Sequence, residues 1–237
     1  MYTQTLTTTP AVVNQITVTA LRREHIAGVE RINAPYGFNA QSFSMENLPQ
    51  VLARFPQGQL AALHQGELVS YAVTMRTMRS PQAAPLAWYD MIGDMTLSQH
   101  VPNGDWLYGV DFIVDPQVRR LGIGSKMYQA RFDLVKRLNL RGMYAGGMLM
   151  GYQRYAHQMT VRDYGEAVIS GRLEDPTVTM QMHRGFKPRA VIEAYTTETP
   201  ACDNAAVLIE WRNPDYRPMV WHMLSSVPPQ HSALAAR

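Results

Sequence analysis

The chain has 237 residues, of which 46% are hydrophobic and 17% are charged, and its formal net charge is +3 at pH 7. This length and composition allow one compact domain with a full core and exclude an intrinsically disordered chain. So small a net charge, with no clustered basic run, argues against nucleic acid as a partner. No apolar run reaches the roughly 18 residues of a membrane span, and the N-terminus lacks a signal-peptide pattern, so no membrane partner is expected.

The single cysteine, Cys202, excludes an intramolecular disulfide, and no group of cysteines and histidines has the spacing of a zinc site. We therefore expect a cytoplasmic protein with no bound metal. We expect one domain over residues 15–218, between an N-terminal tail, 1–14, and a C-terminal tail, 219–237. The sequence leaves open whether this domain forms a homodimer.

The first hundred residues predict strands and helices in alternation. Residues 60–64 and 68–76 flank Gln65-Gly66, a dipeptide typical of a hairpin turn. Residues 79–105 predict an irregular insert. The other elements expected here are a strand over 16–20 and helices over 22–32 and 44–55, the second helix opened by Ser44 and Asn47.

The most informative stretch is residues 106–130, where an apolar strand ends at Asp115-Pro116 and an amphipathic helix begins around Gly122 and Gly124. Glycines at the start of a helix let backbone N–H groups and the positive end of the helix dipole face a phosphate-bearing ligand. The residues that follow match neither a Rossmann fingerprint nor a Walker loop. The turn therefore predicts an anion site of another kind.

The C-terminal part predicts a strand over 142–150, a polar insert over 151–171 and a short helix opened by Asp175-Pro176. Two β-rich runs, 190–196 and 205–211, close the ordered part of the chain. The methionines of this region are predicted to fill core space only. They are Met143, Met148, Met150, Met180 and Met182.

Together these features resemble the GNAT superfamily of acyl-CoA-dependent N-acyltransferases. The turn with Arg119, Gly122 and Gly124 looks like the family's pyrophosphate loop, and residues 184–188, RGFKP, look like its Gly-Phe turn. Residues 146–214 are similar to the acyltransferase domain that some bacteria fuse to nitrilase-type amidohydrolases, although this chain has no room for the hydrolase. The resemblance implies an α/β fold of the α+β type: a single domain with a central, mixed, mostly antiparallel sheet of about seven strands, flanked by helices.

The resemblance also implies an activity. The chain would move an acetyl group from acetyl-CoA, or an acyl group from another acyl-CoA, to a primary amine of a small molecule or peptide. Direct transfer in a ternary complex is favoured, because Cys202, in a predicted loop, is a poor candidate for an acyl carrier. A non-catalytic acyl-CoA-binding sensor or interaction module on the same fold is the alternative.

By the same resemblance, the strand backbone at Phe112, Ile113 and Val114 would pair with the pantetheine arm as an added strand does. The pyrophosphate would lie on the turn that follows, and Arg120 or Lys126 would reach the 3'-phosphate. The residues assigned to this turn are Arg119, Arg120, Leu121, Gly122, Ile123, Gly124, Ser125 and Lys126.

Asp111 is the candidate general base, because an ionised carboxylate inside an apolar strand is costly unless it has partners or water. A purely structural carboxylate is an equal alternative. The carboxylate that several family members use falls at the place of Tyr108. Strand alternation would then put Asp111 on the opposite face unless a β-bulge intervenes.

The usual proton donor of the family, a tyrosine four residues before the glycine of the Gly-Phe turn, is Gln181 here. Its candidate substitutes are Tyr108, Tyr152, Tyr155 and Tyr195. The acceptor pocket is expected between Gly146-Gly147, which permit close approach by a ligand or a neighbouring helix, and the polar insert. In that insert, Tyr155 and His157 are the candidate pocket residues.

Overall fold

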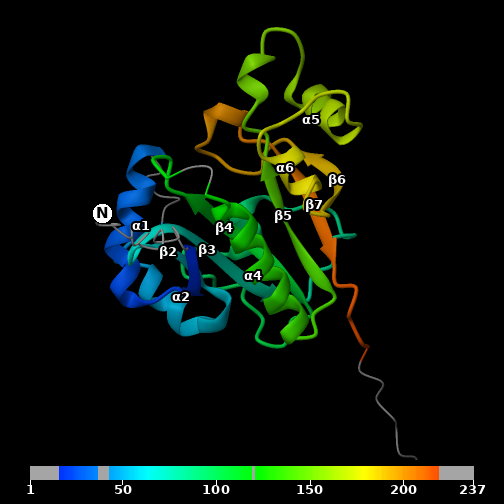
Figure 1. The fold of residues 1–237 in the computed structure, drawn as a ribbon. Helices are drawn as coiled ribbons and strands as arrows, with labels where there is room; N and C mark the ends of the chain where they lie inside the picture. Colours follow the sequence, from blue (N-terminus) through cyan, green and yellow to red (C-terminus); the bar gives the residue numbers. More distant parts are fainter. Residues whose placement is uncertain (1–15, 37–42, 119–120, 219–237) are drawn as a thin grey trace, which may run out of the picture.

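The computed structural model describes residues 16–36, 43–118 and 121–218, which form a seven-stranded sheet with helices on both faces (Figure 1). The strand order is β1-β2-β3-β4-β5-β7-β6. Only β4 and β5 pair in parallel, and every other neighbouring pair is antiparallel. This confirms the expected α/β domain with a mixed, mostly antiparallel sheet. The strands are β1 (Ile16–Ala20), β2 (Leu60–His64), β3 (Glu67–Thr77), β4 (Trp106–Val114), β5 (Gly142–Met148), β6 (Lys187–Ile192) and β7 (Ala206–Arg212).

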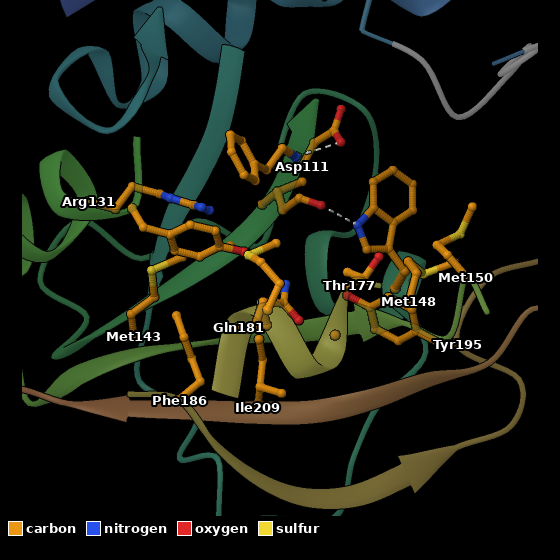
Figure 2. Close-up of a pocket in the computed structure, with 18 of the residues that line it drawn as sticks. Asp111, Arg131, Met143, Met148, Met150, Thr177, Gln181, Phe186, Tyr195 and Ile209 are labelled. Atoms are coloured by element: carbon orange, nitrogen blue, oxygen red, sulfur yellow. Dashed lines mark hydrogen bonds between the residues drawn. The ribbon is translucent and has the colours of Figure 1, made fainter. Parts of the chain in front are cut away.

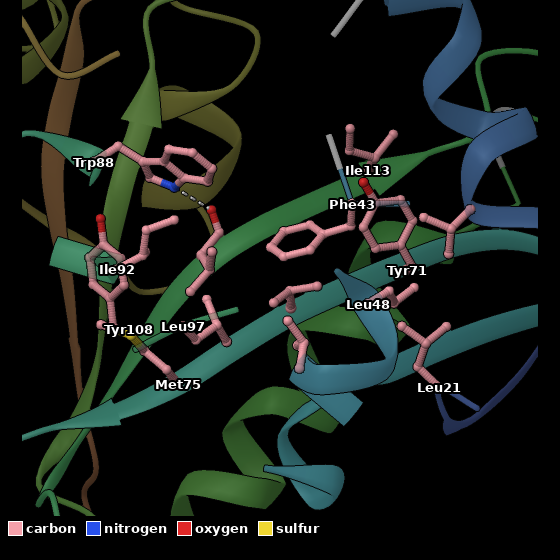
Figure 3. Close-up of a cluster of buried hydrophobic side chains, with 14 of the residues drawn as sticks. Leu21, Phe43, Leu48, Tyr71, Met75, Trp88, Ile92, Leu97, Tyr108 and Ile113 are labelled. Carbon is pink, nitrogen blue, oxygen red and sulfur yellow. Dashed lines mark hydrogen bonds between the residues drawn. The ribbon is translucent and has the colours of Figure 1, made fainter. Parts of the chain in front are cut away.

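Each face of the sheet has its own set of helices. One core joins buried residues of α1, α2 and α3 to Tyr71, Val73 and Met75 of β3, and Figure 3 shows part of it. The opposite face carries α4, α5 and α6. The α-helices are α1 (Ile26–Asn33), α2 (Leu48–Arg54), α3 (Trp88–Ile92), α4 (Ile123–Arg137), α5 (Val161–Ile169) and α6 (Val178–Met182). The 3₁₀ turns are Arg23–His25, Ala34–Tyr36, Pro56–Gly58, Tyr152–Arg154 and Pro200–Cys202.

Local signals correctly marked several of these elements. Gln65 and Gly66 both have positive φ, 53° and 84°, as a two-residue hairpin turn requires. The helix expected from residue 44 begins only at Leu48, and the Asn47 side chain accepts a hydrogen bond from the Ser44 N–H at 3.0 Å. The expected irregular insert, 79–105, contains the short helix α3, which sequence patterning did not reveal.

The sheet opens between its two parallel strands. Pairing of β4 with β5 runs from Trp106 opposite Gly142 only as far as Gly109 opposite Ala145. Beyond this point β4 stays paired with β3, and β5 stays paired with β7. The carboxyl ends of the two strands therefore diverge, which is where open α/β sheets commonly bind ligands.

A β-bulge in β4 lies at the start of this divergence. Thr74 of β3 is opposite Gly109, whereas the preceding residue, Val73, is opposite Asp111, so Val110 is an extra residue in β4. The bulge shifts the alternation by one position. Asp111 consequently lies on the same face of the sheet as Tyr108. Strand alternation therefore no longer argues against Asp111 as the general base.

Several expectations concern residues outside the described part. The tails, 1–14 and 219–237, and the turn residues Arg119 and Arg120 all lie there. Within residues 16–36, 43–118 and 121–218, no helix is both long and apolar enough to cross a membrane.

Candidate active site

A cavity of about 340 Å³ opens where β4 and β5 diverge (Figure 2). This volume lies within the range of small-ligand sites. Its walls come from β4, β5, α3, α4, α6, β7 and the loop around Tyr195. Most lining side chains are apolar, and a few polar groups converge among them: Asp111, Tyr128, Arg131, Thr177, Gln181, Tyr195, Thr196 and Thr199.

Asp111, just after the bulge, is a half-buried carboxyl with defined partners. Its Oδ1 accepts a hydrogen bond from the Phe112 N–H at 2.8 Å, and its Oδ2 accepts from the Tyr71 hydroxyl at 2.7 Å. Burial raises the pKa of Asp111 above its usual value, although Tyr71, the Phe112 N–H and the Arg131 charge partly oppose the rise. A carboxyl with a raised pKa is well suited to accept a proton near neutral pH.

A chain of polar groups continues from Asp111 into the core. The Tyr71 hydroxyl is also 2.7 Å from Asn33 Oδ1, and the Asn33 amide donates to the Phe43 carbonyl. One phenol proton can reach only one of the two oxygens at a time. A proton on Asp111 would therefore complete this chain, in agreement with the raised pKa.

Arg131 lies on the buried side of α4 and enters the pocket from the face of the sheet opposite to that of Asp111. The residue is 2% exposed, and its guanidinium lies 4.1 Å from the ring centroid of Tyr128 and 4.5 Å from that of Phe112. Among the described residues, its Nε and Nη2 have no hydrogen-bond partner. Burial lowers the pKa of Arg131, while Tyr128 and Asp111 raise it. A guanidinium nevertheless remains a cation in proteins.

Gln181 and Tyr128 form a second polar group in the pocket. The Gln181 amide donates to the Tyr128 hydroxyl at 2.9 Å, while its Oε1 has no partner in the described chain. Asp175 fixes the start of α6 by accepting hydrogen bonds from the N–H groups of Thr177 and Val178. This anchor holds Gln181, one helical turn further along, against α4.

Tyr195, which lines the far side of the pocket, forms a buried pair of phenols with Tyr108, which does not line the cavity. The hydroxyls of Tyr108 and Tyr195 are 2.6 Å apart. Burial raises the pKa of Tyr195 to about 12, and burial also raises the pKa of Tyr108 well above its usual value. On the same side, the Trp88 indole donates to the Val110 carbonyl at 2.9 Å, so α3 supports the bulge.

The glycine turn begins α4 as expected. Gly122 has φ 70°, a left-handed conformation that favours glycine, and nothing lies within 4 Å of a Cβ built on it. Ile123, the first residue of the helix, packs in one cluster with Phe112 and Val114 near the end of β4. The helix N-terminus therefore lies beside the strand that lines the cavity.

Side chains near this turn already have partners. Lys126 Nζ donates to the Ile16 carbonyl at 3.0 Å. Arg184, which was not among the predicted site residues, donates to Ser125 Oγ at 2.9 Å. Arg184 thus adds a cation beside the first turn of α4.

The expected pocket residues of the polar insert are not at the cavity. No residue of 151–171 lines it. Tyr152 is buried and donates to the Met159 carbonyl, Tyr155 packs on Tyr164, and His157 is exposed. The insert covers another part of the sheet because α5 packs on β6 and β7. Contrary to expectation, Tyr152, Tyr155 and His157 therefore do not line this cavity.

The glycine pair of β5, Gly146 and Gly147, was expected to line the acceptor pocket, but only Gly146 lines the cavity. The space beside Gly146 is filled by the Tyr195 ring, whose Cζ is 2.2 Å from the place of a Cβ. Gly147 similarly accommodates Gln181 Oε1 at 2.3 Å. The glycines admit neighbouring side chains rather than a ligand. Four of the methionines assigned to the core, Met143, Met148, Met150 and Met180, in fact line the cavity.

Arg131, Tyr128 and Trp88 are site residues that sequence reasoning missed. Arg131 had a detectable signal: it lies four residues after Met127 and four before Val135, inside the apolar stripe of the helix. A charged residue in such a stripe is as informative as Asp111 in its apolar strand.

Comparisons with known proteins agree with this geometry. Residues 28–159, more than half of the chain, match the Acetyltransferase (GNAT) family. The chain is 33% identical over 178 residues to "Probable hydrolase YhcX" of Bacillus subtilis (strain 168), covering 75% of this chain and 35% of that protein. It is 29% identical over 175 residues to "Uncharacterized N-acetyltransferase YkwB" of the same strain, covering 74% and 77%. The chain thus spans about a third of the first relative and about three quarters of the second.

A solved structure shows the same fold. It is the GphF GNAT-like decarboxylase in complex with isobutyryl-CoA, at 20% identity and a TM-score of 0.68, with 83% of this chain and 99% of that chain covered. At this identity the likeness concerns the fold alone.

Proposed function

Since this chain belongs to the acetyltransferase (GNAT) family, we propose that it transfers an acyl group from an acyl-CoA, in the simplest case acetyl-CoA, to a primary amine of a small molecule or peptide. One observation carries the proposal. The cavity between the diverging strands combines a proton-accepting carboxyl, Asp111, with a glycine-started helix beside the same strand.

Binding of the acyl-CoA would use backbone more than side chains. The pairing of β4 with β5 ends at Gly109, so Phe112 and Ile113, further along β4, can pair with an extended pantetheine arm. The pyrophosphate would take the N–H groups at the start of α4. Arg184 is placed to add a charge-assisted contact. The isobutyryl-CoA complex of GphF and the name of YkwB support this choice of ligand and reaction.

Asp111 would accept the proton that the amine loses as its nitrogen forms the new bond to the acyl carbon. As the carbon–sulfur bond breaks, the departing thiolate needs a proton. Tyr128 is our candidate donor, because the amide of Gln181, at the place of the family's tyrosine, donates to its hydroxyl and leaves the phenol proton available. Tyr195 is the second phenol that lines the cavity.

Direct transfer agrees with the state of the only cysteine. Cys202 is fully buried outside the cavity lining, and burial raises the pKa of its thiol to about 11. A nucleophilic cysteine instead needs a thiolate near neutral pH. An acyl-cysteine intermediate therefore has no support.

The test is a binding and turnover assay on the purified chain. Calorimetry should show acetyl-CoA binding, and a panel of primary amines should give release of free CoA thiol that depends on both substrates. In a parallel assay with malonyl-CoA, loss of its free carboxylate as carbon dioxide, with the thioester kept as acetyl-CoA, would instead indicate a decarboxylase, the activity named for GphF. Binding with no thiol release for any amine would favour the non-catalytic module, and no binding would refute both.

A further inference from the structure

We propose that Arg131 binds a carboxylate group of the substrate inside the cavity, carried either by the acyl group or by the acceptor amine. The inference rests on the proposed function and narrows its substrate class. Figure 2 shows the guanidinium directed from α4 toward the middle of the pocket, between the Asp111 side and the Gln181 side.

The first argument is the state of the side chain. Arg131 is 2% exposed, yet two of its nitrogens, Nε and Nη2, have no partner in the described chain. No ion pair with a described acidic side chain neutralises it. Buried charges are normally paired, because removing an ion from water is costly. An unpaired cation at a cavity wall is therefore explained by a ligand that supplies the anion.

The second argument is the shape of the donor group. The Nε–H and a neighbouring terminal N–H of a guanidinium point in parallel, and this spacing matches the two oxygens of one carboxylate. The rings of Tyr128 and Phe112 hold the guanidinium plane from within 4.5 Å. A cation fixed in this way loses little entropy when it binds, which favours it as a specific anchor.

The third argument is the space beside it. A Cβ on Gly109 would lie 3.8 Å from Arg131 Nη1, and closer still to Met143 and Ala145. Gly109 is the last residue of β4 that pairs with β5. The guanidinium therefore lies at the apex of the opening between the strands, where the reacting groups would meet, and not at its outer mouth.

The experiment compares ligands that differ only in a negative charge. In the acyl arm, calorimetry measures binding of malonyl-CoA and of acetoacetyl-CoA, which has the same number of heavy atoms and a neutral methyl ketone. In the acceptor arm, turnover with acetyl-CoA is measured for amino acids and for their amides. Each arm uses the wild type, Arg131→Met, Arg131→Lys and, as a matched control, Arg137→Met at an exposed position of the same helix.

In one of the two arms, the wild type should prefer the carboxylate ligand by about 30-fold or more, as expected for a buried, bidentate charge pair. Arg131→Met should reduce this preference to about one. Arg131→Lys keeps the charge but not the planar fork, so it should retain only part of the preference. Arg137→Met should behave as the wild type. Circular dichroism of each variant checks the fold.

Two results would overturn the inference. One is the absence of a carboxylate preference in both arms. The other is an equal loss of malonyl-CoA, acetoacetyl-CoA and acetyl-CoA binding in Arg131→Met, which would mean that Arg131 holds a part common to all of them. If the wild type binds acetyl-CoA and transfers its acetyl group, but either of these two results is obtained, only this inference fails. If no CoA ester binds the wild type, the proposed function fails and the inference fails with it.

Discussion

A carboxylate introduced at Gly124 should separate ligand binding from folding. Gly124 is the second residue of α4, and the nearest heavy atom to a Cβ built there is Arg184 Nη2, at 4.0 Å. Gly124→Glu therefore fits without a clash. In the first turn of a helix, a glutamate replaces a poor helix former and complements the helix dipole, so the fold should be as stable as before or more stable.

The same carboxylate would oppose a phosphate held at the helix N-terminus. Two unit charges about 5 Å apart repel by about 0.8 kcal/mol in water and about 3 kcal/mol at an effective dielectric constant of 20. The expected loss of acetyl-CoA affinity is thus about 4-fold to about 250-fold. The new carboxylate would also attract Arg184, which removes one cation from the site and adds to the loss.

Calorimetry with acetyl-CoA at low and high salt measures this effect, and Gly124→Gln is the control of equal size without the charge. The glutamate variant should bind more weakly than the glutamine variant, and added salt should reduce the difference. Equal affinities of the two variants, with both folded by circular dichroism, would refute phosphate binding at this turn.

Three further substitutions test single contacts. Asp111→Asn should remove the rise of kcat with pH that accompanies deprotonation of this carboxyl, whose pKa is raised in the folded state. Because of this raised pKa, the carboxyl lowers the stability of the wild-type fold at pH values above its unfolded-state pKa. Thermal unfolding of the Asn variant at pH 8 should therefore show an unchanged or higher Tm. Gly122→Ala should lower the free energy of unfolding by about 1 kcal/mol, since φ is 70° and no neighbour clashes, and lower the Tm by a few degrees. Tyr128→Phe should lower kcat by about 10- to 100-fold without weakening acetyl-CoA binding, whereas Tyr195→Phe should leave kcat unchanged. If a stopped-flow thiol assay shows the loss of kcat in Tyr195→Phe instead, Tyr195 is the proton donor.

Predictions from sequence succeeded where a few adjacent residues carry the signal. Gln65-Gly66 fixes its hairpin because both residues take positive φ, and Gly122 marks the start of α4 for the same reason. Asp111, which lines the cavity, could be singled out because a charge inside an apolar strand is visible in the chain alone. Each of these features depends on local backbone geometry or local composition.

Sequence and structure differ where position along the chain does not correspond to position in space. The insert 151–171 lies between a strand of the pocket and the helix of Gln181, yet α5 packs on β6 and β7 and takes Tyr155 and His157 away from the cavity. The bulge at Val110 follows from the pairing of β3 with β4, for which no local pattern exists. The role of α3 as the support of that bulge depends likewise on a contact across the fold.

The two charged groups of the pocket act on each other without touching. Asp111 and Arg131 lie on opposite faces of β4, and each favours the charged form of the other. A carboxylate bound to Arg131 would neutralise this field and allow the pKa of Asp111 to rise further. Asp111 would then be a stronger base in the complex than in the free protein, at the moment when the amine must lose its proton. Substrate binding and proton transfer would in this way be coupled through the cavity, with no movement of the backbone required.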